Sequence, residues 1–295
     1  MNTFKEENVY KQRREDLRAD CEKCFGLCCV ALNFSASEGF PIDKPAGTPC
    51  IHLQTNFRCG IHDALNKRGL KGCITFDCFG AGQKVSQVSY QGIDWRKEPD
   101  TAQPMFKVFL IMMQLHELLW YLTEALTRQA ALPLHDEIQR MIDQTEQYTL
   151  YRPEQLMQLD IASHRDAVNE LLVQISEKVR AQARTKFKHQ PNTKSNSGRQ
   201  KKIGRGADLI AADLRNTDLR GAHLRGSLLI AANLSGVNLD GADLIGADLR
   251  DAEIAGADLS GSLFLTQAQV NSAKGNSRTL LPPALTHPQH WHDSM

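Results

Sequence analysis

The chain has 295 residues, of which 41% are hydrophobic and 23% charged, and its formal net charge is +1. Enough residues are apolar to bury hydrophobic cores, the length favours two or three domains, and the near-zero net charge indicates no particular class of partner. Charged residues run through Met1 to Asp20, so we expect no secretory signal peptide there.

All 8 cysteines of the chain lie between Cys21 and Cys78. In a reducing compartment, such a density favours metal binding over disulfide bonds. Cys21 and Cys24 have the C-x2-C spacing at which two thiolates reach one ion, and the later cysteines follow loops rich in Gly and Pro. We therefore expect residues 1–92 to form a metal-binding region. Its candidate ligands are Cys21, Cys24, Cys28, Cys29, Cys50, Cys59, Cys73 and Cys78.

The number and identity of the metal ions stay open at this point. Eight thiolates suit two four-thiolate zinc sites, one zinc site with spare thiols, or an iron–sulfur cluster, so the expected cofactor is zinc or iron. His52 or His62 is an alternative ligand, and the adjacent Cys28 and Cys29 are an alternative redox pair. The sequence contains no pattern of a catalytic or nucleotide-binding site.

Residues 93–184 have the apolar spacing of helices. We expect helices over 105–129 and 134–147 and a third that begins with Ser163 as its N-cap. The longest apolar stretch lies in the first of these helices and carries Lys107, His116, Glu117 and Glu124. Those polar groups favour a buried helix over a membrane span, so we expect a soluble, cytoplasmic protein.

Residues 185–206 contain many Lys and Arg residues, no acidic residue, and Pro, Asn, Ser and Gly. This composition predicts a flexible basic linker. Its charges allow at most weak contact with nucleic acid phosphates, and a solvated tether is the preferred interpretation.

From Ala207 the sequence repeats every five residues, as twelve pentapeptides that end at Thr266. The third residue of each unit is large and apolar, and the first is small. A period of five fits neither a helix nor a strand, but it fits a four-sided coil with one pentapeptide per side. The large residues are Leu209, Leu214, Leu219, Leu224, Leu229, Leu234, Leu239, Leu244, Leu249, Ile254, Leu259 and Phe264.

This pattern resembles the pentapeptide-repeat family, whose units read A-(D/N)-L-x-x. The resemblance implies a right-handed quadrilateral β-helix over 207–266. We expect a capping helix and tail over 267–295. With the cysteine-rich head and the helical middle, the predicted fold class is multidomain α+β.

The cysteine-rich segment resembles the CxxCxxCC family, which is associated with zinc or iron chelation. Besides the first cysteines, the segment shares three short sequence motifs with this family. The spacing between Cys24 and Cys28 is three residues, where the family motif has two. The three shared motifs contain Pro49, Cys50, His52 and Leu53, then Cys59 and Ile61, then Cys73 and Phe76.

These observations support three functional hypotheses. We favour a non-enzymatic metal-binding protein whose repeat is a protein-interaction module. The first alternative is an iron–sulfur enzyme related to the lysine N-methylases of the CxxCxxCC family. The second is a DNA-mimicking protein that interacts with a type II topoisomerase, which is suggested by other pentapeptide-repeat proteins. The sequence identifies neither the protein partner nor the oligomeric state.

Overall fold

The computed structural model describes residues 3–187 and 202–291, so most of the predicted linker, residues 188–201, lies outside the described residues. The chain divides into two compact units. Unit 1 comprises residues 1–127 and 132–172, and unit 2 comprises residues 128–131 and 173–295. The long helix α8 (Ile161–Phe187) contributes its first part to unit 1 and its last part to unit 2.

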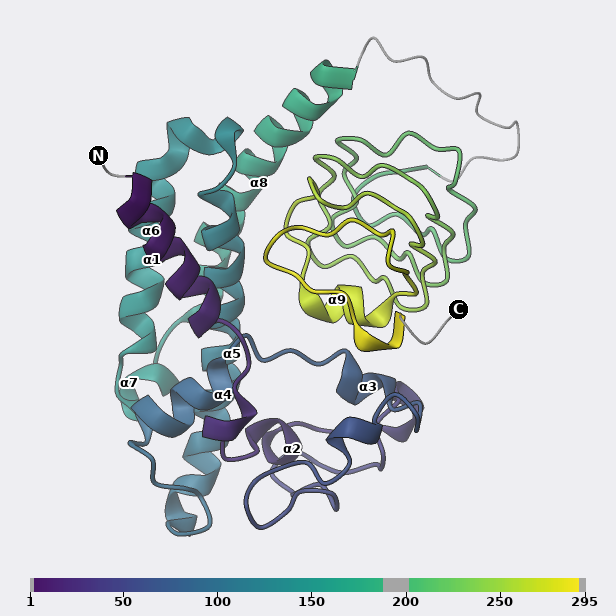
Figure 1. Cartoon of the computed structure of the whole chain (residues 1–295). Coiled ribbons are helices and arrows are strands. Elements are labelled where there is room, and N and C mark those ends of the chain that lie inside the picture. Colours follow the sequence, from purple (N-terminus) through teal and green to yellow (C-terminus); the bar gives the residue numbers. More distant parts are fainter. Residues whose placement is uncertain (1–2, 188–201, 292–295) are drawn as a thin grey trace. The chain divides into compact units, whose positions relative to one another are not determined.

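Unit 1 is built from helices and loops around the central helix α5 (Figure 1). Helices α2, α4, α6 and α7 all contact α5. The helices of unit 1 besides α5 (Ala102–Ala125) and α8 are α1 (Thr3–Asp16), α2 (Leu27–Ala31), α3 (Lys71–Ile74), α4 (Ala81–Lys84), α6 (His135–Thr149) and α7 (Pro153–Met157). Short 3-10 turns lie at Cys21–Lys23, Ala36–Glu38, His62–Ala64, Pro99–Thr101 and Gln129–Leu134, and a π-helical turn at Val85–Ser89 follows α4.

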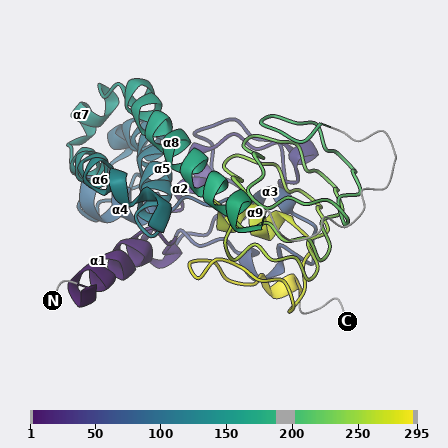
Figure 2. The same cartoon turned by 90° about the horizontal axis from the view of Figure 1, so that it is seen from above.

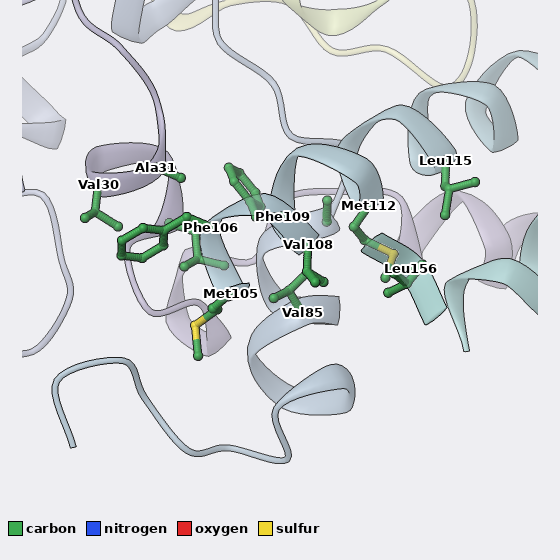
Figure 3. Close-up of a cluster of buried hydrophobic side chains, with 12 residues drawn as sticks. Val30, Ala31, Val85, Met105, Phe106, Val108, Phe109, Met112, Leu115 and Leu156 are labelled. Carbon is green, nitrogen blue, oxygen red and sulfur yellow. The ribbon is translucent and has the colours of Figure 1, made fainter. Parts of the chain in front are cut away.

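The hydrophobic core of unit 1 forms where α5 meets α2 and α4. Figure 3 shows side chains of α5 beside Val30 and Ala31 of α2 and beside Val85 of the π-helical turn after α4. The α5 side chains are Met105, Phe106, Val108 and Phe109. Most of these side chains are fully buried, and each contributes about 1.5–3 kcal/mol to folding by leaving water. Cys24, Cys28 and Cys78 pack at the edge of the same core. The position of the cysteine-bearing segments therefore depends on α5.

The stretch Pro99–Ala125 is the one helical segment of the described residues that is long and apolar enough to cross a membrane. In the structure 67% of its apolar window is buried inside the unit. This burial favours a core helix over a membrane span, as the polar residues of the sequence predict.

Three helices lie where the sequence predicts them, with different ends. Helix α6 begins one residue after the start of the second predicted helix and ends two residues later than predicted, and α5 ends four residues earlier than predicted. Helix α8 begins before Ser163, because the Asp160 carboxylate accepts hydrogen bonds from the Ser163 backbone N–H and hydroxyl. Ser163 is therefore not the N-cap that the sequence predicted. At its other end α8 continues to Phe187, into the segment predicted as a linker.

The repeat of unit 2 winds as a stack of closed turns (Figures 1 and 2). Isolated parallel bridges join residues twenty positions apart, such as Asp208 with Leu228 and Leu228 with Asp248. Backbone hydrogen bonds of 2.7–3.0 Å connect each turn to the next. The twelve large residues of the repeat are all buried, with exposed fractions of at most 5%. Four pentapeptides thus complete one turn around a column of leucines.

The predicted fold class, α+β with a quadrilateral β-helix, is wrong for the described residues. They contain helices and isolated bridges, but no β-strand and no sheet. The reason lies in the short sides of the coil. Each pentapeptide offers one bridging residue and then turns, with positive φ at corner residues such as Gly226 and Ala231. Consecutive bridges that would make a ladder therefore do not form.

The C-terminal end of the coil is covered by helix α9 (Gln267–Ser272) and by the residues that follow. Thr266 and Gln269 form a capping box at the start of α9, and Val270 is fully buried. The Trp291 indole N–H donates to the Ala273 carbonyl at 3.0 Å. These contacts protect the last leucines from water.

Helix α8 packs on one side of the coil through polar contacts within unit 2. The Ser176 hydroxyl donates to the Asp243 carboxylate at 2.6 Å, and the Arg225 Nε lies 3.5 Å from the same carboxylate. Asp243 is fully buried. At Gly241 an added Cβ would lie 2.5 Å from the Ala183 Cβ. The absence of a side chain at Gly241 and the buried carboxylate of Asp243 therefore allow α8 to pack closely on this side of the coil.

Candidate functional site

The cysteines lie on the short helices and loops between Cys21 and Cys78, within unit 1. All eight are free thiols, and only Cys50 is buried while Cys21 is exposed. Cys28 and Cys29 lie on α2, and Cys73 lies on α3. Cys50 and Cys59 lie on the loops between these helices. These loops fold back onto α2 and bring their cysteines close to Cys28 and Cys29.

Five thiols gather around α2, and we call Cys28, Cys29, Cys50, Cys59 and Cys73 the α2 thiol group. The Cys28 and Cys29 Sγ atoms lie 3.9 Å apart. The Cys50 backbone N–H donates to the Cys29 carbonyl at 2.9 Å, which places the two residues side by side. A bridge between Leu53 and Cys59 brings the second loop back to the first.

Cys24 and Cys78 form a second pair beside α4, which we call the Gly82 pair. Their Sγ atoms lie 2.7 Å and 3.8 Å from the point that a Cβ on Gly82 would occupy. Any side chain at this position would collide with the Cys24 sulfur. Gly80, with a φ of +78°, makes the tight turn that starts α4, and its N-terminal neighbours include Cys78.

The pKa values of the thiols reflect their burial. Burial raises the pKa of Cys73 to about 11, with a further contribution from the nearby Cys59 and Cys50 thiols. Burial raises the pKa of Cys78 to about 12. The hydrogen bond with Cys28 raises the pKa of Cys29, and the hydrogen bond with Cys29 raises that of Cys59. In the metal-free chain these thiols are therefore protonated at neutral pH.

The donor set fits a thiophilic metal in its chemistry and in one distance. A tetrahedral site with zinc–sulfur bonds of about 2.3 Å has sulfur atoms about 3.8 Å apart. The 3.9 Å between the Cys28 and Cys29 sulfurs matches that edge. In the described part of the chain, however, no three Cys, His, Asp or Glu side chains are arranged around a common point as metal ligands are. Side-chain rotations would have to accompany metal binding.

Two residues of this site lie outside the sequence prediction. Gly82 leaves room for the two sulfurs of the Gly82 pair, and Lys44 is a buried lysine beside the α2 thiol group. The sequence carries no signal for Lys44, because lysine in a loop is ordinarily exposed. Gly82 could be singled out in the sequence because it lies four residues after Cys78 in a glycine-containing segment.

A separate cavity of about 620 Å³ lies in unit 1 near the end of α1. It is lined by acidic and basic side chains, including Asp16, Lys84 and Glu146, and by His116. The Arg13 Nε lies 2.6 Å from the Glu146 carboxylate. The His116 Nδ1 lies 2.7 Å from the Phe79 carbonyl, and burial lowers the pKa of His116 to about 4. His116 is thus a buried neutral side chain that holds the turn after Cys78 against α5.

Comparison with known proteins shows similarity in the repeat and over nearly the whole chain. A family model described as pentapeptide repeats matches residues 205–226 and 227–264, as 8 copies. The chain is 58% identical over 276 residues to "Uncharacterized protein YybG" of Bacillus subtilis (strain 168), a match that covers 94% of this chain and 95% of that protein. It is also 43% identical over 42 residues to "UPF0153 protein PA1578.1" of Pseudomonas aeruginosa, or 14% of this chain and 50% of that protein.

The family match confirms the pentapeptide repeat that the sequence pattern indicates. Pentapeptide repeats suggest a protein-interaction module. The resemblance of the cysteine-rich segment to the CxxCxxCC family stays a prediction.

Proposed function

The chain belongs to the same family as YybG of Bacillus subtilis, and we propose that it is a non-enzymatic protein-interaction protein that binds zinc or iron through its cysteine-rich region. The observation that carries the metal part is the gathering of free thiols around α2, with two sulfurs at the separation of a tetrahedral edge. The α2 thiol group and the Gly82 pair are the ligand candidates. Cys21 adds a further thiol close to Cys24 in sequence.

A structural role for the metal is supported by the local fold. Between α2 and α4 the chain forms turns, isolated bridges and helices of three to four residues. Such a segment buries few large side chains of its own, and Leu65 is one of the few apolar exceptions. Metal–thiolate bonds supply the folding free energy that a segment of this kind lacks. The metal would thus fix the loops around α2.

The charges of the repeat favour a general interaction surface over a DNA mimic. Asp213, Asp218 and Asp248 each form an ion pair with the arginine two residues later, at 2.7, 2.8 and 2.6 Å. A surface that imitates DNA needs uncompensated negative charge. These pairs neutralise part of the acidic surface of the coil.

Metal analysis of the full chain tests the proposal. Protein purified without oxygen should contain a stoichiometric transition metal, and its visible spectrum distinguishes colourless zinc protein from a brown iron–sulfur protein. A brown protein would favour the iron–sulfur enzyme hypothesis. Protein without bound zinc or iron, after purification or reconstitution, would contradict the proposal.

Serine variants locate the ligands. Cys24→Ser and Cys73→Ser should each reduce the metal content, because each removes a thiolate from one of the two groups. Ile51→Ser is the matched control, since Ile51 lies next to Cys50 and is 71% exposed. It should keep the metal content of the unsubstituted protein. Native metal content in both cysteine variants would exclude these two thiols as ligands.

A further inference from the structure

Lys44 is a buried cation in the cysteine-rich region, with an exposed fraction of 4%. Its Nζ donates to the Leu32 carbonyl and lies 3.4 Å from the Val30 carbonyl. The ammonium also lies 4.3 Å from the centroid of the Phe34 ring. Carbonyl dipoles and an aromatic face hold the ammonium, but they carry no net negative charge. A buried charge of this kind is costly unless an opposite charge lies nearby.

The thiols of Cys50, Cys29 and Cys28 lie close enough to the Lys44 ammonium to interact with it electrostatically. The backbone explains why they are close. Lys44 and Phe34 form an antiparallel bridge, with N–H···O distances of 2.9 and 3.1 Å. Six residues later, Cys50 donates its backbone N–H to Cys29. The segment from Lys44 to Cys50 therefore runs beside α2 and the residues that follow it. It places the Lys44 ammonium at the carbonyl end of α2, the helix that carries Cys28 and Cys29.

We propose that Lys44 is a positioning residue that compensates the negative charge of a metal–thiolate centre formed by the α2 thiol group. The inference rests on the proposed metal binding and adds to it both the ligand group and the counter-charge. A divalent ion with four thiolates carries a net charge of −2, and with three thiolates a net charge of −1. Such a centre gives the buried ammonium a counter-charge, which the Val30 and Leu32 carbonyls do not.

The test compares zinc affinity among lysine variants of the full chain. Lys44→Met keeps the apolar stem and removes the charge, and Lys44→Arg keeps the charge. Lys67→Met is the control, because Lys67 is exposed in the same region. Zinc affinity is measured by competition with a chromophoric chelator, and cobalt substitution reports thiolate ligation through its charge-transfer absorption.

Lys44→Met should weaken zinc binding by about 10- to 100-fold, the range typical of groups that support metal ligands. Lys44→Arg should recover most of this loss, and Lys67→Met should bind as the unsubstituted protein does. Equal zinc affinity in Lys44→Met and the unsubstituted protein would overturn the inference. So would a Lys44→Arg variant as weak as Lys44→Met, because the charge would then be irrelevant.

The melting temperature without metal separates this role from a packing role. Replacing buried ionic groups by apolar side chains of similar volume is often neutral or stabilising. Metal-free Lys44→Met should therefore melt at or above the temperature of the metal-free unsubstituted protein, while zinc should raise its melting temperature less. If Lys44→Met is destabilised equally with and without zinc, the lysine serves only packing and the inference is wrong.

Double substitution identifies the thiol group. The effect of Lys44→Met on zinc affinity should persist in a Cys78→Ser background and disappear in a Cys50→Ser background. The opposite pattern would place the centre at the Gly82 pair. If the unsubstituted protein binds no zinc, cobalt or iron, the proposed function fails, and that result precedes and is distinct from any comparison among the variants.

Discussion

The two ends of the chain stabilise themselves in different ways. In the repeat, every fifth residue enters one column, and neighbouring turns bond backbone to backbone. In the cysteine-rich region, short turns and loops surround free thiols and a buried lysine. The repeat therefore depends on a periodic local pattern, whereas the cysteine-rich region depends on contacts between residues distant in sequence.

This difference determines which perturbations each part tolerates. The repeat should respond to the loss of a core leucine and be indifferent to metal. Unit 1 should respond to acid through His116 of α5, and the proposed metal binding predicts that its cysteine-rich region responds to metal removal. The predictions below test this division.

Leu234→Ala should produce the largest loss of stability, about 3–4 kcal/mol, because it leaves a cavity in a buried column. Leu228→Ala is the matched control, since Leu228 lies in the same coil and is 40% exposed. It should cost less than about 1 kcal/mol. Chemical denaturation measures both values. Similar losses in the two variants would contradict the assignment of Leu234 to the core.

Acid should destabilise unit 1 through His116, by up to about 3 kcal/mol between pH 6.5 and pH 4. The folded state lowers the pKa of His116 to about 4, so the native chain excludes a proton that the unfolded chain takes up near pH 6.5. Stability from this group is complete above pH 6.5 and falls as the pH drops towards 4. The groups that act on the imidazole besides the Phe79 carbonyl are Lys84 and Asp16.

His116→Gln isolates this effect, because glutamine keeps a donor for the Phe79 carbonyl but does not titrate. The difference in unfolding free energy between His116→Gln and the unsubstituted protein should change steadily between pH 6.5 and pH 4. A difference that stays constant over this range would show that His116 takes up its proton equally in both states.

Gly241→Ala should destabilise unit 2 more than Gly246→Ala, by about 1–2 kcal/mol. Both glycines have positive φ, at 68° and 63°, so they share the backbone cost of an added Cβ. Only Gly241 faces α8, where the Cβ would lie 2.5 Å from the Ala183 Cβ, while Gly246 faces open space. Thermal melting of the two variants measures the difference. Equal melting temperatures would show that α8 does not pack on this side of the coil.

Much of the repeat could be predicted from the sequence because its information is local. The five-residue period placed Leu214, Leu234 and Ile254 in the core, and the structure buries them. The predicted β-helix was wrong because one bridging residue per side makes no strand. The sequence does not predict the burial of Asp243. This burial depends on packing against Ser176 of α8, which is distant in sequence.

The sequence shows that the N-terminal region is rich in cysteine, but it does not show which cysteines lie close together in the fold. The density of thiols is visible in the sequence, but the division between the α2 thiol group and the Gly82 pair is not. That division follows from long-range contacts, such as Cys50 with Cys29 and Gly82 with Cys24. Lys44 was missed for the same reason, since nothing in its neighbours along the chain indicates burial.

Hydrogen exchange before and after metal chelation tests the central claim most directly. On the full chain purified without oxygen, amide exchange is followed by mass spectrometry with and without a strong chelator. Peptides from residues 21–90 should lose protection when metal is removed, while peptides from residues 207–264 should exchange as before. Unchanged exchange in residues 21–90, or an equal loss of protection in both regions, would contradict the account.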